Sequence, residues 1–186
     1  MKKQITIFAL TLGAIVLGTN NAQAQAQVAP ATATTTVSIQ LADVISILPG
    51  STSVATPVSF KYNNAEDYYK EQKISRAGGL KVTSTKAFNV EVKANDVNFK
   101  RPEGGEIPVS VLKIVPNASS TMTGVQAEGI TLSTNNQFLV KNSELGAEKT
   151  LDLDYIIPQE KSQSKDILGK PAGTYTQTVT FTASAL

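Results

Sequence analysis

The C-terminal stretch GTYTQTVTFTASAL (residues 173–186) carries threonine at every second position through most of its length. Successive side chains of a β-strand point to opposite faces, so this alternation predicts a strand with one face in solvent. Threonine suits that face because its β-branch favours extended backbone and its hydroxyl tolerates water. We expect Tyr175, Val179 and Phe181 to face the core and Gly173 to supply the preceding turn. Tyr175 is either a plain core side chain or one whose hydroxyl bonds to nearby backbone.

Runs of strand length recur along the chain, separated by clusters of Gly, Pro, Asn and Ser. Before the terminal strand they cover residues 37–41, 54–62, 80–93, 107–115, 129–134, 137–142 and 149–158. Val37, Ile39 and Leu41 share one parity, which predicts a half-buried strand at the start of the domain. Pro57 predicts an edge position for its run, because proline cannot donate a hydrogen bond to a sheet.

Individual runs support more specific predictions. Residues 80–93 form either one long strand with a bulge or two strands joined by a turn. Residues 107–115 are the most continuously apolar run, which predicts a central strand. Asn135-Asn136 predicts a hairpin turn between the runs on either side of it. A helical turn or two is expected only within residues 63–73, which have no clean apolar stripe.

The pattern as a whole predicts an all-β protein of about eight or nine short antiparallel strands, with almost no helix. Each alternating strand has one apolar face, which a second sheet must cover. The expected architecture is therefore an antiparallel β-sandwich. A closed Greek-key barrel would bury the same faces and stays the alternative.

The start of the chain has the three-part organisation of a secretory signal peptide. Lys2 and Lys3 precede an apolar run that is shorter than the roughly 20 residues of a membrane-spanning helix. Small residues follow, and we expect cleavage after Ala24 or Ala26 and a secreted, cell-surface or periplasmic location. The expected organisation is a signal peptide (1–24), a flexible lead-in (25–36) and a β-sandwich domain (37–186).

Charge and reactive side chains exclude several classes of function. The chain has 17 basic and 15 acidic residues, and the basic excess lies in the leader, so the mature chain is near neutral. A neutral surface of mixed sign predicts no binding to nucleic acid. The sequence contains no cysteine and no histidine, which removes disulfides, thiol nucleophiles, the commonest general base and the usual zinc ligands. We therefore expect no enzyme, no cofactor and no metal site.

The C-terminal phrase KPAGTYTQTVTFTASAL resembles the last strand of secreted pilin-type β-sandwiches, the spore coat protein U group and its relatives. Chains of that group tend to end on the pattern A-G-T-Y-x-x-T-V-x-V-T. The matching residues here are Ala172, Gly173, Thr174, Tyr175, Thr178, Val179, Phe181 and Thr182. The resemblance implies an immunoglobulin-like fold and an extracellular structural or adhesive role.

Some members of that group polymerise by donating an N-terminal strand to a neighbouring subunit. The candidate exchangeable strand in this chain comprises Val37, Ile39 and Leu41, whose alternate apolar side chains suit pockets along a sheet edge. Pairing of this strand within its own domain is the competing expectation. The disulfide common among pilins is impossible in a chain without cysteine.

The most site-like cluster is the acidic and aromatic stretch Glu66-Asp67-Tyr68-Tyr69. Adjacent tyrosines in an exposed loop can stack on sugar rings, which makes this stretch a candidate glycan-contact loop. The competing interpretation is that one tyrosine covers the edge of the core and the other has no specific role.

Asp152 and Asp154 lie two residues apart in a predicted strand, so both side chains face the same side. Such a pair can hold calcium or serve a glycosidase. Leu151 and Leu153 already occupy the opposite, core-facing side, and no calcium-binding loop surrounds the pair. We expect both carboxylates to lie on a solvated outer face.

These observations predict a secreted, non-enzymatic structural or adhesive subunit of the cell surface, pilin-like in its assembly. The alternative is a module that binds cell-wall glycan or peptidoglycan through residues 63–73. The expected partners are further copies of the chain, other surface proteins or cell-wall glycan.

Overall fold

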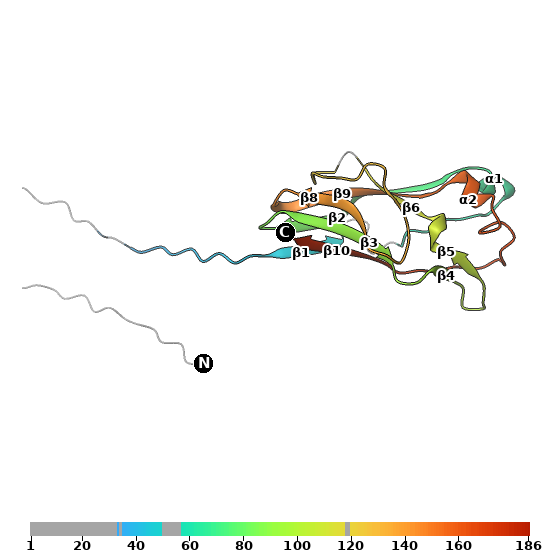
Figure 1. Cartoon of the computed structure of the whole chain (residues 1–186), viewed down its shortest axis with the longest axis horizontal. Coiled ribbons are helices and arrows are strands. Elements are labelled where there is room, and N and C mark those ends of the chain that lie inside the picture. The colour runs from blue at the N-terminus through green and yellow to red at the C-terminus, as the bar shows by residue number, and fades with distance from the viewer. Residues whose placement is uncertain (1–32, 34, 50–56, 118–119) are drawn as a thin grey trace, which may run out of the picture. The chain divides into compact units, whose positions relative to one another are not determined.

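Ten β-strands and three short helices form the described part of the chain, residues 33, 35–49, 57–117 and 120–186 of this computed structural model (Figure 1). The larger sheet has the strand order β1 (Ile45–Pro49), β2 (Gln72–Ser84), β9 (Gly146–Ile157), β6 (Lys113–Pro116) and β7 (Ile130–Thr131). The second sheet has the order β10 (Val179–Ala185), β3 (Phe88–Ala94) and β8 (Gln137–Ser143). A small hairpin pairs β4 (Asn98–Lys100) with β5 (Glu106–Pro108). The helices are α1 (Ala65–Tyr68), the 3-10 helix η1 (Val109–Val111) and α2 (Gln159–Ser162).

Every strand pairing in the described part is antiparallel, and apolar side chains from both main sheets form one core. This arrangement confirms the predicted all-β antiparallel sandwich. The chain divides into two units, residues 1–39 and 40–186. Of the first unit the structure describes residues 33 and 35–39, which contain no helix or strand. The predicted signal peptide (1–24) lies outside the described residues, as does most of the predicted lead-in (25–36).

The core consists of side chains that alternate along the strands. In β3, Phe88, Val90 and Val92 are almost fully buried, whereas the residues between them are partly exposed. The larger sheet contributes Val82, Ile114, Leu151 and Leu153. Full burial of one such side chain stabilises the fold by roughly 1.5–3 kcal/mol relative to leaving it in water. A one-residue slip would turn this whole set outward, so the core sets the register of both sheets.

The expected half-buried strand at residues 37–41 is wrong. Val37, Ile39 and Leu41 belong to no strand, and their side chains are 81%, 82% and 88% exposed. The first strand is β1, which begins at Ile45 and pairs with the end of β2. An alternating pattern identifies a face that can be buried, but it does not say what covers that face.

Two other expected strands and one expected hairpin differ from the structure. Residues 57–62, the described part of the run that contains Pro57, form no strand. The run 107–115 is divided between β5, η1 and β6. Of these, only β6 has a neighbouring strand on each side, β9 and β7, whereas β5 pairs with β4. Asn135-Asn136 does not close a hairpin, because β7 and β8 belong to different sheets. Residues 80–93 are two strands joined by a turn, which was one of the two predicted alternatives.

The terminal strand β10 is shorter than its threonine pattern predicts, because the strand proper begins only at Val179. Val179 and Phe181 pack against the core, as expected. The hydroxyl of Tyr175 donates a hydrogen bond to the Pro171 carbonyl oxygen at 2.8 Å, which is the backbone contact that the sequence left open. Gly173 bends the chain at φ +148°, and a Cβ atom there would lie 2.5 Å from Cδ of Arg101. This turn therefore requires glycine.

Candidate functional site

The tyrosine pair predicted from the sequence belongs to a short helix at the end of the sandwich opposite the C-terminus (Figure 1). Asn64 begins this helix, α1, with its side-chain oxygen accepting a hydrogen bond from the Asp67 amide at 3.1 Å. The Asp67 carboxylate accepts hydrogen bonds from the amides of Asn63 and Asn64 in return. This reciprocal capping box satisfies amides that a helix leaves without partners at its start. It also fixes where α1 presents Tyr68 and Tyr69.

Asp67 therefore has a structural role, because its carboxylate caps the start of α1. Its side chain is nearly buried, and its Oδ1 atom lies 2.9 Å from Nζ of Lys70. The hydrogen bonds from Lys70 and from the Asn63 amide hold the pKa of Asp67 below its usual range. Its carboxylate is thus negative at neutral pH and already engaged. Glu66 precedes it on the exposed surface.

Tyr68 is held in place from the interior of the protein. Its ring centroid lies 4.7 Å from that of Tyr62, with the ring planes tilted by 40°. Tyr62 in turn shares a 2.8 Å hydrogen bond between its hydroxyl and that of the fully buried Ser162 in α2. Burial is the main cause that raises the pKa of Tyr62. Tyr68 is half-buried by these contacts, whereas Tyr69 is 67% exposed.

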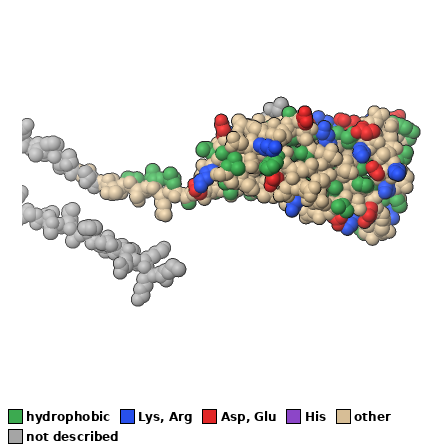
Figure 2. All heavy atoms as spheres, in the orientation of Figure 1, with side chains coloured by type: hydrophobic (Ala, Val, Ile, Leu, Met, Phe, Trp, Pro, Cys, Tyr) green, Lys and Arg blue, Asp and Glu red, His purple; other side chains and the backbone are tan. Residues whose placement is uncertain are grey.

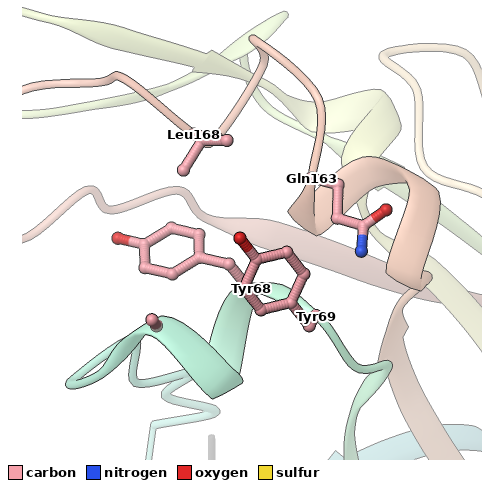
Figure 3. A pocket seen from close by; sticks show the side chains of 5 residues that line it. Tyr68, Tyr69, Gln163 and Leu168 are labelled. Atoms are coloured by element: carbon pink, nitrogen blue, oxygen red, sulfur yellow. The ribbon is translucent and has the colours of Figure 1, made fainter.

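A shallow open pocket of about 440 Å³ lies over these tyrosines. It is lined by Ala65, Tyr68, Tyr69, Gln163 and Leu168. Figure 3 shows Leu168 pointing toward the tyrosines from the loop that follows α2, and Gln163 at the end of α2, directly after its last residue. None of these five side chains carries a charge, and Glu66 and Asp67 do not line the pocket. The structure thus divides the predicted stretch: its tyrosines face the pocket and its carboxylates do not.

Gln163 and Leu168 are pocket residues that the sequence did not indicate. They lie far along the chain from Tyr69, and only the contact between α1 and α2 brings them beside it. Leu168 is 51% exposed, as are several other large apolar side chains of the described chain. An isolated leucine in a polar stretch is too common to mark a site, so no local signal identified it.

A second candidate region is the end of the sandwich that holds the start of β1 and the C-terminus. The turn between β2 and β3 lies at its centre: the Thr85 amide donates to the Val44 carbonyl, and the Leu186 amide donates to the Ala87 carbonyl. Leu145, in the turn from β8 to β9, directly precedes Gly146, the residue that pairs with Ser84. The side chains of Val44, Leu145 and Leu186 are 50%, 60% and 60% exposed. We call these three residues the apolar end.

The free edge of β10 reaches this end. In the described part of the chain β10 pairs with β3 alone, and β1, the edge strand of the other sheet, lies beside it (Figure 1). The inward side chains Val179, Phe181 and Ala183 are only half-buried although they touch the core. Their faces are therefore incompletely covered within one copy of the chain.

The expectation that Asp152 and Asp154 share a solvated outer face is wrong for Asp154. Its side chain is 6% exposed, and its Oδ2 atom lies 2.8 Å from Nζ of Lys73. Burial raises the pKa of Asp154, but hydrogen bonds from Lys73 and Ser75 outweigh it, and the pKa lies below the usual value. Asp152 accepts a hydrogen bond from the amide of Gly78, where β2 bulges away from β9.

Among the described residues, no cluster of three or more acidic side chains is placed to hold a metal ion. In the same residues no helix is both long and apolar enough to cross a membrane. Figure 2 shows acidic and basic side chains interspersed over the face in view. No family model matches the sequence and no curated protein matches it, so the resemblance to the spore coat protein U group stays a prediction.

Proposed function

We propose that this chain is a secreted, non-enzymatic subunit of a cell-surface structure, and that it assembles through residues 37–41. The observation that carries the proposal is the exposure of Val37, Ile39 and Leu41, which place apolar groups in water at alternate positions. Leaving such side chains exposed forgoes roughly 1.5–3 kcal/mol each. This free energy would be recovered if the sheet edge of a second copy paired with the main chain of residues 37–41 and buried their apolar side chains.

We propose that the edge of β10 receives this segment; β1 lies beside β10, but in the described chain it pairs with β2. The seven residues of β10 contain no proline, and its inward side chains Val179, Phe181 and Ala183 have surface left to cover. The outer edge of β8 is already occupied, because the Gln126 and Lys141 amides tie residues 124–126 to it. β7 has only two residues, and β1 ends in a proline.

The apolar end supports the same assembly. Val44, Leu145 and Leu186 each leave at least half of their surface exposed, and backbone hydrogen bonds tie Val44 and Leu186 to the turn between β2 and β3. Contiguous apolar surface of this kind marks protein contacts. A neighbouring copy whose residues 37–41 pair with β10 would end its strand against this surface.

The test compares Ile39→Asp with Gln40→Asp in leader-free protein. Both positions are exposed, so neither change should alter the melting temperature. Ile39→Asp should abolish regular multiples on an unheated gel and filaments under negative stain, whereas Gln40→Asp, on the other face of the segment, should retain them. A synthetic peptide of residues 35–43 should block assembly of the unaltered protein. A wild-type protein that stays monomeric at high concentration, or assembly that survives Ile39→Asp, would refute the proposal.

A further inference from the structure

We propose that the pocket between α1 and α2 binds a neutral sugar ring of a glycan chain. This inference is independent of the assembly proposed above, because the pocket lies at the opposite end of the sandwich from the C-terminus and the apolar end (Figure 1). Its volume of about 440 Å³ falls within the range of roughly 300–1,000 Å³ found for small-molecule sites.

The first argument is the aromatic platform. Tyr68 is fixed by its contact with Tyr62, which is itself anchored on Ser162 through the 2.8 Å hydrogen bond. A ring held in this way loses little conformational entropy when a ligand stacks on it. Tyr69 is 67% exposed and forms no ring contact in the described part of the chain, so packing does not account for its position.

The second argument is the polarity of the lining. Within the described residues, no hydrogen bond engages the Tyr69 hydroxyl, the Tyr68 hydroxyl or the side-chain amide of Gln163. These groups supply both donors and acceptors. A pyranose presents C–H groups on its faces, which suit the tyrosine rings and Leu168, and hydroxyls at its rim, which suit the phenols and the amide (Figure 3).

The third argument concerns charge. The five lining side chains are uncharged. Among the charged residues near them, Asp67 is paired with Lys70 at 2.9 Å and Lys161 with Asp166 at 3.7 Å, whereas the exposed Glu66 and Lys165 do not line the pocket. An anionic ligand would find no free cation in the lining, and a cationic ligand no free carboxylate. The chemistry of the pocket therefore selects an uncharged polar ring over a phosphate, a uronic acid or a basic peptide.

The experiment titrates the leader-free protein with chitotetraose and cellotetraose by calorimetry, and measures retention on insoluble chitin and cellulose. At least one probe should bind saturably. Tyr69→Ala should weaken that binding about five- to tenfold, the loss expected for one stacked ring. Tyr69→Phe keeps the ring and should lose less, and Gln163→Ala removes the amide and should also weaken binding. The matched control is Phe138→Ala, a partly exposed aromatic side chain on β8, outside this pocket, which should bind like the unaltered protein.

Tyr68 is left unaltered in these variants because it supports Tyr62, and its loss would mix binding with stability. Melting curves of each variant separate the two effects. Absence of saturable binding to all four probes would overturn the proposal. Binding that Tyr69→Ala and Gln163→Ala leave unchanged would overturn it as well. None of these outcomes depends on whether the chain assembles.

Discussion

Nζ of Lys73 lies 2.8 Å from Oδ2 of Asp154, whose side chain is 8% exposed although it belongs to the outer face of β9. The pair joins β2 to β9, the two longest strands of the larger sheet. Because the lysine side chain remains half-exposed, the ammonium group keeps water while it neutralises the buried carboxylate. The buried carboxylate of Asp154 therefore depends more on this ion pair than the ammonium group of Lys73 does.

Asp154→Asn should make the stability of the protein less dependent on acid pH. The pKa of Asp154 is lowered in the folded state, so its contribution is present above the pKa of the unfolded chain and is lost as pH falls through the lower, folded value. Unfolding by urea between pH 6 and pH 2 should show a shallower decline for Asp154→Asn than for the unaltered protein. Those pH limits are about two units either side of the ordinary carboxyl pKa.

The matched control is Glu148→Gln, which removes the carboxylate of an exposed pair with Lys81 at 3.8 Å. Exposed pairs contribute roughly 0–1 kcal/mol, so this change should leave the pH profile nearly unaltered. Equal slopes for Asp154→Asn and the unaltered protein would show that the buried pair is not linked to folding.

Tyr155 should make folding sensitive to alkali. Burial raises its pKa to about 12, although the nearby Arg76 lowers it. A tyrosine whose folded pKa is raised contributes stability that is complete below the unfolded pKa of about 10 and is lost as pH rises through the folded value. Tyr155→Phe should therefore reduce the loss of stability between about pH 10 and pH 12, measured by urea unfolding.

Spectroscopic titration of phenolate absorbance provides the check on this assignment. The unaltered protein should show a late step near pH 12 that Tyr155→Phe removes. Tyr69→Phe is the control, because Tyr69 is mostly exposed and its removal should leave the late step in place. A late step that persists in Tyr155→Phe would contradict the prediction.

Gly124→Ala should be one of the most damaging single substitutions in the chain. Its φ is +70°, and a Cβ atom there would overlap the carbonyl oxygen of Lys141, a main-chain atom that cannot move aside freely. We expect a loss of more than about 4 kcal/mol in the free energy of unfolding, since the residues around it must separate.

Gly104→Ala isolates the backbone part of that loss. Gly104 also has a positive φ, +89°, but a Cβ atom there would meet nothing within 4 Å. This variant should lose only about 1–2 kcal/mol, the cost of placing an L-residue in left-handed backbone. Urea unfolding of both variants measures the difference, and similar losses for the two would mean that the steric contact with Lys141 is relieved at little cost.

Asn64→Ala should lower the free energy of unfolding by about 1 kcal/mol, the usual cost of losing a helix cap. Asn63→Ala is the control, because Asn63 contributes only its backbone amide to the Asp67 carboxylate and should stay within about 0.5 kcal/mol. Thermal unfolding of both proteins tests the prediction. Equal melting temperatures would mean that the Asp67 carboxylate holds α1 without the reciprocal bond.

The sequence by itself determined the strands whose pattern is local. The alternation of Phe88, Val90 and Val92 and that of Leu151 and Leu153 identified the core faces of β3 and β9, because side-chain direction along a strand depends only on parity. The same reasoning placed Val179 and Phe181 against the core. The helical turn expected within residues 63–73 is α1, but the expectation of helix in that stretch alone is wrong, because η1 and α2 lie outside it. The all-β class follows from these local features.

Only the tertiary structure decided which segments lie beside one another. Parity could not show that β7 and β8 belong to different sheets, that residues 37–41 have no partner strand in the described chain, or that Lys73 covers Asp154. It could not bring Gln163 and Leu168 to Tyr69 either. The physical reason is that a local pattern records which face of a segment avoids water, whereas the choice of covering surface depends on contacts between residues far apart in the chain.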